Sequence, residues 1–225
     1  MFPITIIDNF LPKPDKFVDF IKTLEFTPTP TGNYPGERSK PINEIDEFLF
    51  RKIARRVLTT FYADPFPQAW GMDMTVQRIK PFVKNKEEQF QPYNKGWIHT
   101  DTGEMAVGVL YLDKDPIDST GTIFYEADDV CPSAGGNWMD IKENYYRGEK
   151  KYTREEYNEA FIANNSQYKK TVTVENVYNR LILFRGNQYH SADTFGYGKK
   201  YRHILNLFIP NFYGASTPLQ RNGMI

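Results

Sequence analysis

The stretch Trp97-Ile98-His99-Thr100-Asp101-Thr102-Gly103-Glu104 decides how the rest of the chain is interpreted. It places an imidazole and a carboxylate two residues apart, and on a β-strand such residues point to the same face of the sheet. A nitrogen donor and an oxygen donor that project together are two parts of a metal site. A His-x-Asp triplet also occurs by chance in surface turns, so the flanking sequence has to distinguish the two interpretations.

A third metal ligand must come from another part of the chain, which holds two further histidines, His190 and His203. Two histidines and one carboxylate form the facial triad of non-heme Fe(II) oxygenases, which leaves three coordination positions free. His190 follows a buried-looking strand over 179–186, whereas strand alternation points His203 away from Arg202 and favours a structural role. Nitrogen and oxygen donors without thiolates suit Fe(II) and argue against structural zinc. The candidate set is therefore His99 and Asp101, with His190 or His203 as the third ligand.

The sequence around these residues predicts a series of β-strands. Apolar or alternating runs bounded by turn residues occur at 3–8, 73–79, 105–113, 122–124, 179–186 and 202–209.

The order of motifs along these strands resembles the 2-oxoglutarate/Fe(II)-dependent dioxygenase superfamily, and within it the prolyl-4-hydroxylase-like group. The motifs are His99-x-Asp101, Tyr111-Leu112-Asp113, Gly121-Thr122-x-Phe124, the distal His190 and the following Arg202. They cover roughly residues 74–213. The segments Ile6-Ile7-Asp8-Asn9-Phe10 and Tyr34-Pro35-Gly36-Glu37-Arg38 also resemble a poorly characterised, often phage-encoded branch of the superfamily.

The resemblance implies two cofactors, which are Fe(II), held by the triad His99, Asp101 and His190, and 2-oxoglutarate. Arg202 is the expected clamp for the distal carboxylate of 2-oxoglutarate, because a guanidinium can make two parallel charge-assisted hydrogen bonds. Tyr111 and Thr122 are further candidates for contact with 2-oxoglutarate, although a purely core role is an alternative for Tyr111. Gln77 and Asn206 are candidates for orienting the metal-bound histidines.

The implied activity is that of a hydroxylase acting on a peptidyl or small-molecule substrate with release of succinate and CO₂. Superfamily members that halogenate lack the carboxylate ligand, so Asp101 favours hydroxylation. One alternative is a non-catalytic jelly roll that binds a ligand or partner and retains the motif as a relic. Another is a cupin-type isomerase or lyase, a class that usually presents three or more histidine ligands. The substrate itself stays open between a peptidyl proline, a small metabolite and a nucleotide.

Composition limits the remaining possibilities. The chain has 225 residues and equal numbers of basic and acidic residues, so no net charge attracts nucleic acid or an anionic membrane. It has no run long and apolar enough for a membrane span, and its N-terminus lacks the pattern of a signal peptide. The single cysteine, Cys131, excludes an internal disulfide and fits a reducing compartment. The expected location is the cytoplasm.

The expected fold is α+β and mainly β, in one domain spanning 1–225. Residues 1–72 would supply a strand and helices that pack on the sheet, and residues 73–213 a double-stranded β-helix (jelly-roll) core. Helices are predicted after Pro12-Lys13-Pro14-Asp15, over 43–62, and over 154–164 behind a Thr153/Glu156 capping box.

Two segments are predicted to lie outside the core strands. Residues 27–42, rich in proline, are expected to form an ordered loop. Arg38 within it could reach a substrate, but a solvated side chain is the favoured interpretation. The insertion 126–171 is predicted to be a mobile lid or substrate-recognition element hinged at Gly135-Gly136.

Overall fold

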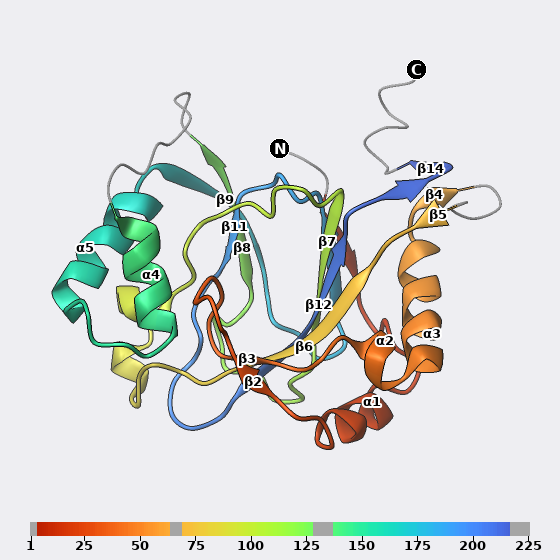
Figure 1. The fold of residues 1–225 in the computed structure, drawn as a ribbon, viewed down its shortest axis with the longest axis horizontal. Helices are drawn as coiled ribbons and strands as arrows, with labels where there is room; N and C mark the ends of the chain where they lie inside the picture. Colours follow the sequence, from red (N-terminus) through yellow and green to blue (C-terminus); the bar gives the residue numbers. More distant parts are fainter. Residues whose placement is uncertain (1–3, 64–68, 128–136, 217–225) are drawn as a thin grey trace.

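Two antiparallel sheets form the body of the molecule (Figure 1). The computed structural model describes residues 4–63, 69–127 and 137–216. The larger sheet contains, in spatial order, β1 (Thr5–Ile7), β10 (Leu181–Phe184), β7 (Ala106–Tyr111), β12 (Arg202–Ile209), β6 (Asp73–Ile79), β3 (Glu37–Arg38) and β2 (Thr27–Pro28). The smaller sheet contains β11 (His190–Ala192), β8 (Thr122–Ala127) and β9 (Tyr168–Val174). Two short ladders pair β13 (Phe212–Tyr213) with β5 (Ala69–Trp70) and β14 (Ala215–Ser216) with β4 (Tyr62–Ala63).

The helices gather on two sides of these sheets (Figure 1). One group is α1 (Pro14–Ile21), α2 (Ile42–Ile45) and α3 (Glu47–Leu58), and the other is α4 (Trp138–Tyr146) and α5 (Arg154–Asn165). Single 3-10 turns occur at Lys86–Glu88 and Pro92–Asn94. Over the described ranges, no helix has the length and apolar character needed to cross a membrane.

Strand alternation gives the large sheet two different faces. On β12, Leu205, Leu207 and Ile209 share one apolar cluster with Ile53 and Val57 of α3. The alternate residues of the same strand belong to the other face, and they are Arg202, Ile204, Asn206 and Phe208. A one-residue slip in register would exchange the two rows and place an arginine and an asparagine in the apolar cluster. Because burying one aliphatic side chain contributes roughly 1.5–3 kcal/mol, the alternation strongly fixes this register.

The predicted strands at 73–79 and 202–209 are present with those boundaries, and the capping box at Thr153 and Glu156 begins α5. The single helix predicted over 43–62 is wrong. Asp46 has an extended backbone that separates α2 from α3, and its side chain caps α3 by accepting a 2.9 Å hydrogen bond from the Leu49 amide. Phe48, in the first turn of α3, is 77% exposed.

The prediction of an irregular 27–42 segment is also wrong in part, because β2 and β3 lie within it. β3 adds to the edge of β6, with Arg38 opposite Gln77. Arg38 is therefore held on the sheet and is half-buried, in contrast to the expected solvated loop residue.

The insertion 126–171 contains α4 and most of β9, neither of which was predicted. The side chains of α4 and α5 form an apolar cluster with Trp97, whose indole N–H donates a 2.7 Å hydrogen bond to the Tyr157 hydroxyl. These contacts make both helices part of the folded core next to His99, which argues against a lid that detaches as a unit. The proposed hinge Gly135-Gly136, like Cys131, lies outside the described residues.

Candidate metal centre and its pocket

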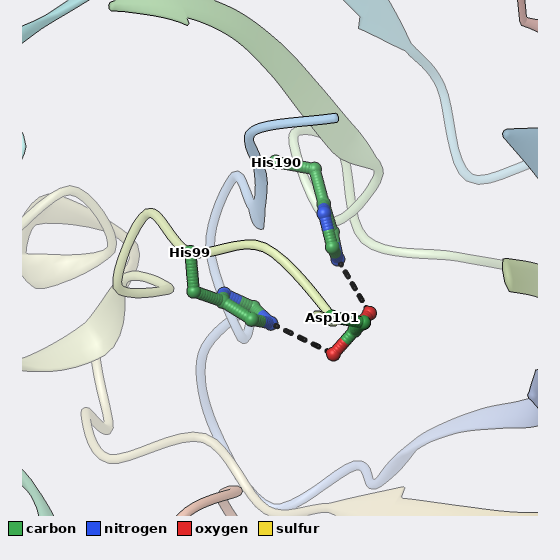
Figure 2. A group of neighbouring side chains, drawn as sticks. All are labelled: His99, Asp101 and His190. Carbon is green, nitrogen blue, oxygen red and sulfur yellow. Dashed lines mark ion pairs between the residues drawn. The ribbon is translucent and has the colours of Figure 1, made fainter. Parts of the chain in front are cut away.

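His99, Asp101 and His190 converge, as Figure 2 shows. One Asp101 carboxylate oxygen lies 3.8 Å from His99 Nε2 and the other lies 3.4 Å from His190 Nε2. One donor atom from each of the three residues lies within 4.8 Å of the other two. The remaining histidine, His203, has its Nδ1 3.2 Å from an Asp113 carboxylate oxygen, in keeping with the structural role predicted for it.

A reciprocal pair of backbone hydrogen bonds joins the two histidine segments. The His99 amide donates to the His190 carbonyl at 3.1 Å, and the His190 amide donates to the His99 carbonyl at 3.0 Å. This single bridge continues the small sheet by one residue beyond β11. The expectation of a strand carrying both His99 and Asp101 is therefore wrong, because Asp101 already lies in the following turn, where its amide donates to the Gly186 carbonyl at 2.8 Å.

Two glycines permit this close approach of segments. A Cβ atom on Gly96 would lie 2.6 Å from the Ala192 amide nitrogen, and one on Gly186 would lie 2.6 Å from the Asp101 carbonyl oxygen. Because real Cβ atoms do not approach that closely, any larger residue would separate the segments that carry the triad.

Backbone carbonyls fix the tautomer of both histidines. His99 Nδ1 lies 2.8 Å from the Trp97 carbonyl and His190 Nδ1 lies 2.9 Å from the Gln188 carbonyl. A carbonyl only accepts, so Nδ1 carries the hydrogen in each ring and Nε2 presents its lone pair toward Asp101.

Gln77 and Asn206, predicted to orient the histidines, do not do so. Instead, the Asn206 amide donates a 2.6 Å hydrogen bond to the Gln77 side-chain oxygen, and the Gln77 amide donates to the Pro35 carbonyl.

The surroundings favour neutral imidazoles. Desolvation lowers the pKa of His99 well below its ordinary value, and the neighbouring His190 and Lys142 act in the same direction, although 44% of the His99 side chain is exposed at the pocket mouth. Desolvation also lowers the pKa of His190, against the opposing effect of Asp101. Neutral Nε2 atoms beside a carboxylate are the form that binds a divalent metal.

This donor set fits a metal ion. Nitrogen and oxygen ligands bind at about 2.0–2.2 Å, which places two ligands at right angles about 3.0 Å apart. The separations of 3.4 and 3.8 Å are to different oxygens of Asp101, and the three donor atoms lie within 4.8 Å of one another, so the side chains have to move inward to hold one ion.

The pocket beside the triad extends along the polar face of β12. Arg202 lies at one end, only 5% exposed, with its Nε donating a 2.7 Å hydrogen bond to the Thr120 carbonyl. Its guanidinium carbon lies 5.8 Å from the centre of the Tyr111 ring. Among the described residues no carboxylate forms an ion pair with Arg202, and desolvation lowers the pKa of its guanidinium.

Tyr111 and Thr122 lie beside Arg202 but differ in access to the pocket. The buried Tyr111 hydroxyl donates a 2.7 Å hydrogen bond to Thr122 Oγ1, and Thr122 lines the pocket.

Two further cationic residues line the pocket. Arg38 was expected to be solvated, with contact to a substrate as the alternative, and it lines the pocket. Lys142 comes from α4 and is only 7% exposed. No motif surrounds Lys142, so the sequence carried no signal for it.

The chain belongs to a family of unknown function, DUF6445, whose family model matches residues 2–195. Among curated proteins, no sequence matches the chain.

Solved structures show the class of fold. HygX from Streptomyces hygroscopicus, with nickel, 2-oxoglutarate and hygromycin B bound, is similar with a TM-score of 0.55 and 12% identity over 92% of this chain and 82% of HygX. The non-heme α-ketoglutarate-dependent epimerase SnoN from nogalamycin biosynthesis is similar with a TM-score of 0.52 and 12% identity, over 92% of this chain and 77% of SnoN. These two matches show that the chain shares the fold of HygX and SnoN. A Pseudomonas putida prolyl-4-hydroxylase also matches, with a TM-score of 0.48 and 11% identity over 93% of this chain and 92% of the hydroxylase.

Proposed function

We propose that this protein is an Fe(II)- and 2-oxoglutarate-dependent dioxygenase of the prolyl-4-hydroxylase-like kind, in which the two sheets close as a double-stranded β-helix. The observation that carries the proposal is the convergence of two histidine Nε2 atoms and a carboxylate in the same pocket as a buried, unpaired arginine. The oxygenase fold of the structural neighbours supports it.

His99, Asp101 and His190 are the proposed iron ligands. The Trp97 and Gln188 carbonyls hold the two rings with Nε2 directed at the metal position. With iron and 2-oxoglutarate bound, the centre supplies O₂ activation for the overall conversion of R–H, 2-oxoglutarate and O₂ into R–OH, succinate and CO₂. The presence of Asp101 favours hydroxylation over halogenation.

Arg202 is the proposed partner for the distal carboxylate of 2-oxoglutarate. Its Nε is already bonded to the Thr120 carbonyl, so the terminal nitrogens are the donors left for the ligand. Thr122 Oγ1 accepts from Tyr111 and keeps its own hydrogen for the same carboxylate. Tyr111 therefore acts by orienting Thr122 and not by direct contact. Burial excludes water, which strengthens each of these interactions.

The substrate is proposed to be a small molecule or a peptidyl group that enters at the exposed edge of His99. The alternative function is a non-catalytic ligand-binding protein with a relic site. The intact tautomer arrangement at both histidines favours catalysis, because a relic site is under no requirement to keep the two carbonyl contacts.

Anaerobic addition of Fe(II) and 2-oxoglutarate tests the proposal directly. We expect the weak visible charge-transfer absorption of an iron-bound 2-oxo acid in the wild-type protein and its loss in His99→Ala. A folded, iron-loaded wild-type protein without that absorption would favour the non-catalytic alternative.

A further inference from the structure

Two cations in the pocket are not used by the proposed iron and 2-oxoglutarate sites. Arg38 from β3 and Lys142 from α4 both line the pocket that holds the triad. Within the described part of the chain, neither forms an ion pair with a carboxylate.

Arg38 is held in position with donors to spare. Its guanidinium carbon lies 3.7 Å from the centre of the Tyr34 ring, which covers one face of the group. Stacking leaves the in-plane N–H groups for hydrogen bonds. Only one of these donates, to the Gln77 side-chain oxygen at 3.4 Å, and Nε is buried without any partner. A buried unpartnered donor of this kind is unfavourable, so a ligand that pairs with it gains affinity.

Lys142 has a similar environment. It lies on the buried face of α4, one turn before Tyr146, which also lines the pocket. Its ammonium has no hydrogen-bond partner among the described residues, and desolvation lowers its pKa. A largely buried lysine side chain without an ion-pair partner among the described residues is unfavourable for folding, which is typical of a residue retained for binding.

The elements that carry the two cations contact each other. The side chain of Arg147, which directly follows α4, donates a 2.8 Å hydrogen bond to the Thr31 carbonyl. A Cβ atom on Gly32 would lie 2.2 Å from the carbonyl oxygen of Glu143 in α4. The loop before β3 and the helix α4 thus meet at the pocket wall, which fixes Arg38 and Lys142 relative to the triad.

Arg38 is separate from Arg202. Arg38 donates to Gln77, and Gln77 accepts from Asn206, which stands four residues along β12 from Arg202. At about 3.3 Å per residue, this distance along the strand is about 13 Å. A molecule of 2-oxoglutarate bound between the triad and Arg202 therefore leaves the other end of the pocket free.

The charges in the pocket also show an excess of cations. Arg38, Lys142 and Arg202 face one carboxylate, Asp101. With both histidines neutral, the charges of a divalent metal and a 2-oxoglutarate dianion cancel. The three cationic side chains and the one carboxylate then leave the pocket with a surplus of two positive charges. Such a surplus favours a further anion.

We infer that Arg38 and Lys142 form a second anion subsite, which binds a carboxylate or phosphate group on the molecule that is oxidised. The inference rests on the proposed function and names the class of its substrate as acidic. Binding of the acidic group beside the triad positions the neighbouring C–H bonds of the substrate at the metal centre.

Titration calorimetry with inorganic phosphate and with acetate tests the subsite in the full chain holding Zn(II) and 2-oxoglutarate. The variants are Arg38→Gln and Lys142→Met, with the exposed Lys150→Met on the same insertion as the matched control. We expect at least one anion to bind the wild type and the control equally. Each test variant should weaken that binding about tenfold or more, while 2-oxoglutarate affinity stays unchanged. The anion that binds more tightly identifies the substrate group as phosphate or carboxylate.

Three results would overturn the inference: no binding of either anion to the wild type, equal binding in both variants, or loss of 2-oxoglutarate affinity in place of anion affinity. If one variant fails to fold, the other suffices for the test.

The same titration without metal and 2-oxoglutarate separates the two proposals. Anion binding that depends on Arg38 and Lys142 in a protein that binds no 2-oxoglutarate would remove the dioxygenase function and leave the subsite.

Discussion

At the scale of single residues, two carbonyl groups determine the chemistry of the triad. The Trp97 and Gln188 carbonyls each stand two residues before the histidine that they orient. An imidazole bonded in this way exposes Nε2 whether or not a metal is present, which reduces the reorganisation needed on binding.

Arg202→Lys should weaken 2-oxoglutarate binding by roughly 10- to 150-fold while iron affinity hardly changes. The substitution keeps the charge but removes the two-pronged donor, and hydrogen bonds to charged groups contribute roughly 1.5–3 kcal/mol each. His99→Ala is the matched comparison and should show the reverse order, with metal binding lost first and 2-oxoglutarate binding following. Calorimetric titration of each ligand measures both effects. Equal 2-oxoglutarate affinity in wild type and Arg202→Lys, with iron saturating, would remove Arg202 from the site.

Lys142→Met should stabilise the ligand-free protein by about 1 kcal/mol or more, because it removes a buried cation without a partner. Burial lowers the pKa of Lys142 in the folded state. Below that lowered pKa, the charge on Lys142 reduces the free energy of unfolding. The reduction disappears as pH rises toward the ordinary pKa of 10.5. The gain measured by urea unfolding should therefore be full at neutral pH and shrink in strongly alkaline buffer. A variant less stable than wild type at neutral pH would contradict this, and Lys150→Met should change stability little.

Single residues also show where sequence interpretation stops. The triad follows from residue type and spacing, although its geometry arises from one β-bridge and a turn and not from the strand that was predicted. The burial of Arg38 depends on β3 pairing with β6, a contact between residues about 40 positions apart. No local pattern encodes such a contact, so the sequence could not place Arg38 in the pocket.

At the scale of elements, prediction succeeded where one face of an element is apolar and its ends carry clear signals. β6, β12 and the capped start of α5 are examples. It failed for α4, which buries Lys142 and Asn144 along with apolar residues and so lacks a clean amphipathic pattern. The break between α2 and α3 was missed because Asp46 was treated as a helix interior residue and not as a cap.

Asn165 is the element-scale link between α5 and the metal centre. Its side chain accepts a 3.1 Å hydrogen bond from the Ile98 amide and donates a 3.2 Å bond to the Gly96 carbonyl. Asn165→Ala should loosen the segment before His99 and lower metal affinity about 10- to 100-fold, as substitutions behind a ligand commonly do. The exposed Glu159→Ala on the same helix is the control. Unchanged metal affinity in Asn165→Ala would show that α5 has no part in positioning His99.

At the scale of the whole molecule, the large sheet separates two tasks. One face packs on α1 and α3 and supplies much of the hydrophobic stability, and the other carries the pocket between the two sheets. The face that packs on α1 and α3 is almost entirely apolar and supplies this stability. The pocket face can therefore carry polar residues such as Arg202 and Asn206.

The pocket should link ligand binding to global stability. A metal ion at 100 times its dissociation constant stabilises the folded state by about 2.7 kcal/mol, which for a chain of this size raises the unfolding midpoint by about 5–10 °C. We expect Mn(II) to raise the midpoint, 2-oxoglutarate to raise it further only when metal is present, and a chelator to reverse both shifts. Stabilisation by 2-oxoglutarate to the same extent without metal would place its binding away from the triad.

The most direct test of the central claim is an anaerobic crystal structure with Mn(II) and 2-oxoglutarate, in which anomalous scattering locates the metal. We expect one metal bound by His99 Nε2, His190 Nε2 and an Asp101 oxygen at about 2.0–2.2 Å, with the distal carboxylate of 2-oxoglutarate on Arg202. A metal bound elsewhere, or one at the triad with 2-oxoglutarate turned away from Arg202, would contradict it.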